Sequence, residues 1–185
     1  MDNNIILASQ SPRRKNLLEM AEINFTIQAA DIDETPPEGL PVADVPEYLA
    51  KEKAKVIAAK HPNATIVAAD TVVILDGRIL GKPDTKADAV TILKQLSGNI
   101  HKVVSGVCIQ RGDEQDCFSV TTEVHFRPIT EEQIVHYVTN YKPYDKAGAY
   151  AIQEWIGIIG IEKIVGDYYN VMGLPVGDVV RRLYI

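Results

Sequence analysis

Residues 5–15, "IILASQSPRRK", run from an apolar segment into a cluster of cations, and this stretch decides how the chain begins to fold. The apolar letters "IILA" predict a short strand. Ser11 is of a residue type favoured at a helix N-cap, and Pro12 is favoured at the first helical position. The stretch therefore predicts a strand, a tight loop and then a helix over residues 12–21.

The first turn of this predicted helix contains three cations, Arg13, Arg14 and Lys15. The N-terminus of a helix is itself positive, so acidic residues are the ones expected there. We interpret Lys15 as part of a solvated face. For the two arginines we favour an anion site, because the unpaired N–H groups of a helix N-terminus and the guanidinium groups can bind the same phosphate. Ser9 and Ser11 add hydroxyl donors to this loop.

Helical and extended patterns alternate along the rest of the chain, which predicts the α/β class with some antiparallel pairing. "NFTIQAA" predicts a strand, and "ATIVAADTVVIL" predicts either a buried strand pair or one long strand. "HKVVSGVCIQ" and "DCFSVTTEVHFRPI" predict a hairpin around Gly112. Helices are predicted over 44–60 and 86–97, near 175–183, and after the capping-box pair Thr130 and Gln133.

The composition is that of an ordinary globular protein, with 185 residues, 46% hydrophobic and 24% charged. This length suffices for one domain with a substantial core or for two small lobes. The net charge of −6 argues against sequence-independent nucleic-acid binding, but not against a small anionic ligand in a local basic pocket. The first ten residues lack the features of a signal peptide, and no run has the length of a transmembrane helix.

Cysteine and histidine suggest no chemistry by their spacing. Cys108 and Cys117 flank the turn-like "QRGDEQD". Two cysteines in such a chain indicate neither a disulfide scaffold nor a zinc site, and we expect a pair of reduced thiols in the hairpin. The histidines are scattered, and none forms a convincing triad spacing with a serine and an acid.

Two charged residues fall inside apolar patterns. Lys53 lies between Leu49 and Ile57 on the apolar stripe of its predicted helix, so it either extends to the edge of the stripe or points into a wet polar cavity. Asp70 lies inside the β-branched run "IVAADTVVIL", where an unpaired acid is costly to bury. It is either a strand-end aspartate bonded to backbone N–H groups or a carboxylate at the rim of a cleft that holds a metal or a water.

Two loops add further charged groups. Lys82 follows a glycine in "GKPDT", which is not a Walker loop because no serine or threonine follows the lysine. Asp31, Asp33 and Glu34 form an acidic loop that is either solvated or a source of oxygen ligands, which suit magnesium or manganese. These features suggest an enzyme that acts on a phosphorylated small molecule with a hard divalent metal.

Several longer stretches, "ILASQSPRRKNLL", "AADTVV", "LGKPDTKADA", "LSGNIHKVVSGV", "DKAGAYAIQ" and "GDYYNVMGLP", resemble the Maf family of nucleoside triphosphate pyrophosphatases. They follow the family's order over nearly the whole chain. The resemblance implies a cytoplasmic protein in which residues 1–185 form a single Maf-like domain. It also implies an α/β fold with an elongated mixed β-sheet flanked by helices, with two lobes around a cleft, related to the inosine triphosphate pyrophosphatases.

The family's reaction cleaves a nucleoside triphosphate between its α and β phosphates, which yields the monophosphate and pyrophosphate. The combination of Arg13, Thr71 and Gln153 resembles the branch that acts on dTTP and UTP, and such an enzyme would clean the nucleotide pool. Two alternatives stay open: a non-catalytic nucleotide-binding regulator of cell division, and a sugar-nucleotide or phosphotransfer enzyme of similar build. The expected partner is a small-molecule nucleotide, with no nucleic acid and no membrane, and a homodimer is one option for the oligomeric state.

The resemblance also implies roles for individual residues. Asp70 would be the base that activates water, and Glu34 and Asp70 would hold a divalent metal cation, magnesium or manganese. The triphosphate would then be the anion that the cationic start of the first helix lacks. The residues expected to bind the substrate are Ser9, Arg13, Arg14, Lys53, Thr71, Lys82 and Gln153.

This sequence departs from the family pattern at three positions. Ala68 and Glu154 stand where glycine is common, and Ser105 replaces a common threonine. Glu154 directly follows Gln153, so it is the departure expected to affect the base pocket.

Overall fold

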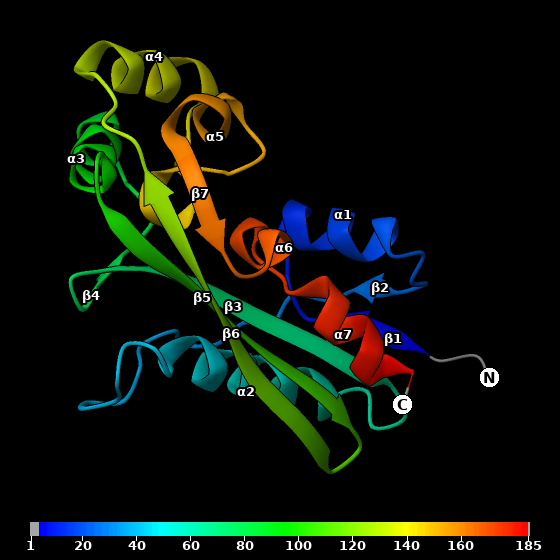
Figure 1. Ribbon diagram of the computed structural model, residues 1–185. Coiled ribbons are helices and arrows are strands. Elements are labelled where there is room, and N and C mark those ends of the chain that lie inside the picture. The colour runs from blue at the N-terminus through cyan, green and yellow to red at the C-terminus, as the bar shows by residue number, and fades with distance from the viewer. Residues whose placement is uncertain (1–3, 185) are drawn as a thin grey trace. The chain divides into compact units, whose positions relative to one another are not determined.

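The structure of the chain, a computed structural model, describes residues 4–184 (Figure 1). Within these residues, helices accompany a mixed sheet of seven strands, which confirms the predicted α/β class. None of the helices in this part of the chain has the length and apolar character that a membrane crossing requires.

The described residues form two compact units. Unit 1 comprises residues 4–71, 105–120 and 173–184, and unit 2 comprises residues 72–104 and 121–172. Three strands contribute one part to each unit. They are β3 (Thr65–Leu75), β5 (Ile100–Arg111) and β6 (Glu114–Phe126).

Unit 1 begins with parallel pairing at the start of the chain. β1 (Ile5–Leu7) pairs in parallel with β2 (Thr26–Ile27) and with β3, and its last residue lies opposite Val67. Residues 68–71 of β3 therefore extend past the carboxyl end of β1. The helices of the unit are α1 (Pro12–Met20), α2 (Val45–Ala58) and α7 (Val176–Leu183). In Figure 1, α2 lies on one side of these strands, and α1 and α7 lie on the opposite side.

Small residues let α2 approach the strands of unit 1 closely. Ala50 and Ala54 of α2 share a buried cluster with Ile66 and Ala68 of β3. A Cβ on Gly106 of β5 would lie 2.1 Å from the backbone nitrogen at the start of α2, so only glycine fits there. This close packing fixes the height of α2, and with it the position of Lys53, above the sheet.

Unit 2 has antiparallel pairing on both sides. β4 (Arg78–Leu80) pairs with the end of β3, and β7 (Ile161–Val165) pairs with β6, with an irregularity between His125 and Phe126. The helices of the unit are α3 (Lys86–Leu96), α4 (Glu131–Tyr141), the 3₁₀ helix η1 (Ala147–Ala149), α5 (Trp155–Gly160) and α6 (Tyr168–Met172). α3 packs on α4 and η1, and a cluster of buried side chains from strands and helices forms the core of the unit.

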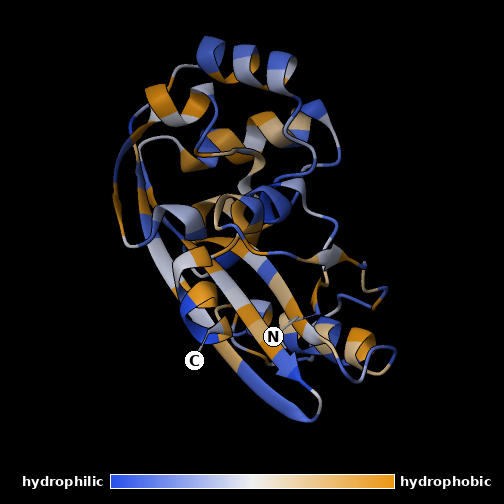
Figure 2. Cartoon of the chain, turned by 90° about the vertical axis from the view of Figure 1, so that its right-hand side faces the viewer, coloured by the Kyte–Doolittle hydropathy of each residue, from blue (hydrophilic) through white to orange (hydrophobic). Residues whose placement is uncertain are grey.

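Most elements with a strong local signal occur where they were predicted. The capping box of Thr130 and Gln133 opens α4, and the hairpin turns around Gly112 at a hydrophilic tip (Figure 2). The stretch "ATIVAADTVVIL" is one long strand, so the alternative of two strands was wrong. β2 is shorter than predicted, and β4, α5 and α6 were not predicted.

The prediction of reduced thiols was wrong, because Cys108 and Cys117 are joined by a disulfide in unit 1. Their Cα atoms, on the two strands of the hairpin, lie 4.1 Å apart. The number and spacing of the cysteines cannot predict this bond, because it depends on the register of the hairpin. That register places the two side chains opposite each other.

A buried histidine lies within the aromatic core of unit 2. His101 is 1% exposed, and its Nε2 lies 2.8 Å from the hydroxyl of Tyr150. The rings of Phe126 and Tyr150 pack against it at centroid distances of 5.4 and 5.5 Å. Burial, together with the charge of His125, lowers the pKa of His101 to about 4. The imidazole is therefore neutral in the folded chain at neutral pH.

We predict that His101 weakens the fold as the pH falls. In the unfolded chain the imidazole takes up a proton near pH 6.5, whereas in the folded chain it does so only near pH 4. The free energy of unfolding that depends on the neutral His101 is therefore fully present above pH 6.5. It falls between pH 6.5 and 4, by about 3 kcal/mol if the whole difference in pKa is expressed. Urea unfolding of wild type and His101→Phe at pH 7 and 4.5 measures this. An equal pH dependence in both proteins would contradict it, and exposed His136→Gln is the control.

Candidate functional site

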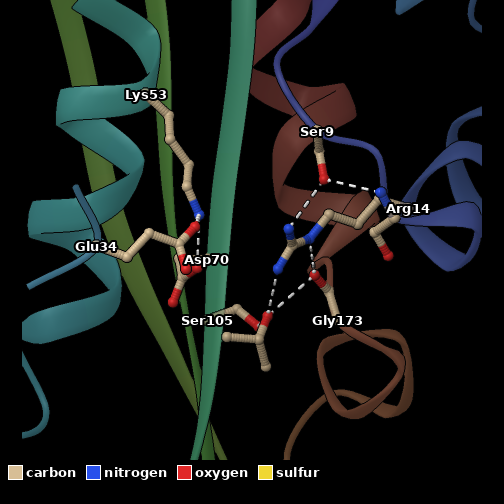
Figure 3. Close-up of polar contacts among 9 residues, drawn as sticks. Ser9, Arg14, Glu34, Lys53, Asp70, Ser105 and Gly173 are labelled. Carbon is tan, nitrogen blue, oxygen red and sulfur yellow. Dashed lines mark hydrogen bonds and ion pairs between the residues drawn. The ribbon is translucent and has the colours of Figure 1, made fainter. Parts of the chain in front are cut away.

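The side chain of Arg14 is the centre of a polar network in unit 1 (Figure 3). Its Nε donates to the carbonyl oxygen of Gly173 at 2.8 Å, one terminal nitrogen donates to Ser9 Oγ at 3.1 Å, and the other donates to Thr71 Oγ1 at 3.1 Å. Thr71 Oγ1 also donates to the carbonyl oxygen of Gly173 at 3.1 Å and lies 2.8 Å from Ser105 Oγ. Three of the five N–H groups of Arg14 thus connect α1 with the loop after β1, with β3 and with the segment before α7, and Thr71 extends the network to β5.

Ser9, rather than Ser11, serves the start of α1. Ser11 is at the N-cap position, as predicted, but its side chain makes no capping hydrogen bond. Its backbone N–H instead donates to Ser9 Oγ at 3.2 Å. The same oxygen accepts from Arg14, so a single hydroxyl ties the loop to the cationic turn that follows it.

The surroundings of Arg14 make its protonated form less favourable than in water. Burial lowers its pKa, the charge of Arg13 lowers it further, and the carboxylates of Asp70 and Glu34 act in the opposite direction. A guanidinium stays protonated in proteins, so the cation is partly desolvated and close to a second positive charge. An anion that binds next to Arg13 and Arg14 would relieve that repulsion.

A second network surrounds Lys53 in the same unit. Its Nζ lies 2.7 Å from Glu34 Oε1 and 2.8 Å from Asp70 Oδ1. The Lys53 side chain is only 10% exposed, whereas that of Glu34 is 58% exposed. The ammonium group of Lys53 therefore lies in polar surroundings formed by two carboxylates and does not extend to the solvent at the edge of the apolar stripe. Asp70 is likewise paired with a cation, because its Oδ1 accepts from Lys53 Nζ.

The two networks lie on opposite faces of one strand. Asp70 and Thr71 are consecutive in β3, and successive side chains of a strand point to opposite faces. Asp70 points to Lys53 of α2 (Figure 3), and the hydroxyl of Thr71 accepts a hydrogen bond from Arg14 of α1. Both lie in the part of β3 that extends past the carboxyl end of β1, which is where open α/β sheets bind ligands.

The fit of a divalent metal can be judged from the donor atoms of Glu34 and Asp70. Both carboxylates approach one cationic atom, Lys53 Nζ, so the site already concentrates negative charge around a cation. Carboxylate oxygens are the ligands that magnesium and manganese prefer. Among residues 4–184, no group of three or more acidic, histidine or cysteine side chains forms a complete cage. The two carboxylates fit such an ion if the substrate or water supplies its other ligands.

The remaining two predicted residues belong to unit 2. Lys82 is exposed and follows Gly81, whose carbonyl oxygen accepts a hydrogen bond of 3.1 Å from Gly148 N. Gln153 is exposed and lies five residues beyond Gly148, in the turn before α5. The structure thus places the loop of Lys82 against η1, five residues before Gln153, although the two stretches are far apart in the sequence.

Two members of the Arg14 network were not predicted to have a role there. Ser105 was noted only as a departure from the family pattern, and Gly173 contributes a backbone carbonyl. A carbonyl acceptor leaves no signal in the residue type. The one available hint is that both residues lie inside stretches that resemble the family, "LSGNIHKVVSGV" and "GDYYNVMGLP".

Comparison with known proteins gives matches over nearly the whole chain. The dTTP/UTP pyrophosphatase of Cytophaga hutchinsonii is 47% identical, over 98% of this chain and 84% of its own. The protein of the same name from Bacteroides thetaiotaomicron is 45% identical, over 97% of this chain and 92% of its own. Among solved structures, the Staphylococcus aureus Ham1 protein is 21% identical, over 66% of this chain and 71% of its own, with a TM-score of 0.47.

The family assignment rests on a family model described as Maf-like protein, which matches residues 4–184 of this chain. The match includes all of the candidate site residues, from Ser9 to Gln153. Together with relatives that are well above 40% identical, it shows that this chain belongs to the Maf-like protein family.

Proposed function

We propose that this protein hydrolyses dTTP and UTP to the nucleoside monophosphate and pyrophosphate, and so removes nucleotides from the pool, with residues 1–185 acting as a single Maf-like domain. The observation that supports it most is that two consecutive residues of β3 belong to the two networks. Asp70 pairs with Lys53, and Thr71 accepts a hydrogen bond from Arg14. The relatives from Cytophaga hutchinsonii and Bacteroides thetaiotaomicron are named for this activity.

The cations of unit 1 would bind the triphosphate. Attack on the α-phosphorus increases negative charge on phosphate oxygens, and fixed cations stabilise that charge without reorganising. Arg13 and Arg14 at the start of α1, with Ser9, would contact the phosphates, and Lys53 would contribute a further positive charge. Arg14 is already held by three protein acceptors, so its guanidinium is placed before the substrate arrives.

Asp70 would act as the general base. Its Oδ1 accepts from Lys53, so the carboxylate is oriented, and its Oδ2 would accept the proton of the attacking water. Glu34 and Asp70 would hold the divalent cation, magnesium or manganese. When bound, such an ion neutralises phosphate charge and lowers the pKa of water, which suits a base as weak as a carboxylate.

Gln153, Lys82 and Thr71 would complete substrate binding. The amide of Gln153 can donate and accept, which matches the O4 and N3–H edge that uracil and thymine share. Lys82 would add a charge for the phosphates. Thr71 would act through its hydroxyl, which accepts from Arg14 and donates to the carbonyl of Gly173.

We predict that Asp70→Asn abolishes pyrophosphate release but not nucleotide binding. The substitution keeps the shape and removes the base, which costs about 10²–10⁴-fold, and more if the carboxylate also holds the metal. Pyrophosphate release from dTTP and dTTP affinity by calorimetry measure the two effects, with exposed Asp76→Asn as the control. If wild-type protein binds dTTP without releasing pyrophosphate, the chain is a nucleotide-binding regulator, such as one of cell division, and not this enzyme.

We predict different consequences for the two neighbouring arginines. Arg13→Ala and Arg14→Ala should each lower kcat/KM by the loss of a charge-assisted contact, about 1.5–3 kcal/mol. Arg14→Ala should also lower the melting temperature, because Ser9, Thr71 and Gly173 lose their donor. Kinetics and thermal unfolding of both variants test this, with Lys15→Ala as a control. Two fully active variants would show that the arginines are not part of the site.

We predict that the activity depends on a divalent metal through Glu34. A chelator should remove pyrophosphate release, and added magnesium or manganese should restore it. Glu34→Gln should require a higher metal concentration, since a carboxamide is a weaker ligand than a carboxylate. Asp33→Asn in the same loop is the matched control, because the asparagine can still accept the hydrogen bond that Asp33 Oδ1 receives from the backbone N–H of Thr35. Full hydrolysis in excess chelator would exclude the metal from the reaction.

A further inference from the structure

A buried polar cluster in unit 2 surrounds the carboxylate of Glu154. The hydroxyl of Tyr137 donates to Glu154 Oε2, and Lys146 Nζ lies 3.5 Å from Glu154 Oε1. The same Tyr137 hydroxyl accepts from the backbone N–H of Ala151 at 3.3 Å. Lys146 also pairs with Asp145, at 2.8 Å. The carboxylate of Glu154 is therefore held by groups from α4 and from the segment before η1.

Three groups of this cluster are largely shielded from solvent. Tyr137 is fully buried, and the side chains of Lys146 and Glu154 are 10% and 24% exposed. Burial and the bond to Glu154 raise the pKa of Tyr137, so its hydroxyl stays protonated and remains a donor. Loss of one partner would leave a buried polar group without its hydrogen bond, which is costly in a poorly solvated place.

This cluster lies at the base of the turn that presents Gln153. Glu154 N donates to the carbonyl of Ala151 at 3.1 Å, and Gly157 N donates to the carbonyl of Glu154 at 2.9 Å. A Cβ on Gly157 would lie 1.8 Å from the carbonyl oxygen of Ile152, so α5 packs tightly against the turn. Backbone bonds and the Glu154 side chain thus fix the residues on both sides of Gln153, which is itself exposed.

We propose that Glu154 is a positioning residue for base recognition, and that its carboxylate, bound by Tyr137 and Lys146, holds the turn that orients the amide of Gln153. The inference rests on the proposed function. It assigns to this departure from the family pattern a supporting role outside the base pocket, because the charge of Glu154 is directed to Lys146. A side-chain amide distinguishes donor from acceptor only if its orientation is fixed, so loss of the anchor should weaken selection of the base.

The test compares Tyr137→Phe, Glu154→Gln and Glu154→Ala with wild type on dTTP, UTP and dCTP. Tyr137→Phe and Glu154→Ala should raise KM for dTTP and UTP about three- to tenfold with little change in kcat, and should reduce the preference over dCTP by the same factor. Glu154→Gln should be intermediate, since its carboxamide oxygen still accepts from Tyr137. Tyr141→Phe, one turn later on α4 and stacked on Tyr137, is the matched control and should match wild type.

A double-mutant cycle shows whether Glu154 acts through Gln153. In a Gln153→Ala background, Glu154→Ala should change KM no further. Additive effects on KM, or a lower melting temperature with unchanged base preference, would mean that Glu154 is only structural and would overturn the proposal. If Glu154→Ala does not fold, Tyr137→Phe and Glu154→Gln decide the same question.

Hydrogen exchange separates this proposal from the proposed function. The backbone amides of residues 151–157 should exchange faster in Glu154→Ala and Tyr137→Phe than in wild type, and unchanged exchange would show that Glu154 does not hold the turn. If wild type releases no pyrophosphate from dTTP or UTP, the proposed function fails and the base-recognition role fails with it. The exchange result then still reports whether the anchor exists.

Discussion

The alternation of side chains along β3 is the constraint on which the arrangement in unit 1 depends. Asp70 and Thr71 are neighbours in the chain, but the pleat directs one toward α2 and the other toward α1. A one-residue shift in the register of β3 would exchange their faces, so that the acid met Arg14 and the hydroxyl met Lys53. The observed register instead keeps Ile66 and Ala68, on the same face as Asp70, in the buried cluster with α2.

Each network balances charge in a different way. Around Lys53, two carboxylates share one ammonium, so the group has an excess of negative charge and suits a further cation. Around Arg14, the direct partners are neutral oxygens, so the cation has no carboxylate among its hydrogen-bond acceptors and suits an anion, although the charges of Asp70 and Glu34 favour its protonated form. A metal-bound triphosphate has both characters. The pair of networks on a single strand is consistent with that kind of ligand, which neither network would suit alone.

The sequence predicted those parts of the fold and site that leave a local signature. Recognisable patterns mark the capping box at Thr130, the proline at the start of α1 and the lysine on the apolar face of α2. The carbonyl of Gly173 has none, and the disulfide depends on register between strands. Lys53 shows where this limit lies: its position on an apolar face signalled a polar environment, but only the packed structure identifies Glu34 and Asp70 as its partners.

Glu154 illustrates how a residue can depart from a family pattern without disturbing its neighbours. A carboxylate next to Gln153, which we propose to contact the base, would repel the phosphates of a nucleotide if it were directed at them. Here its two oxygens meet a phenol donor and the ammonium that Lys146 shares with Asp145, so the carboxylate is directed to partners within unit 2. Tyr137 and Lys146 must both be present for that arrangement, because each alone would leave one oxygen of a partly buried carboxylate without a partner from the cluster. We therefore expect the three residues to form one functional unit, in which removal of any one side chain reduces the order of the turn that contains Gln153.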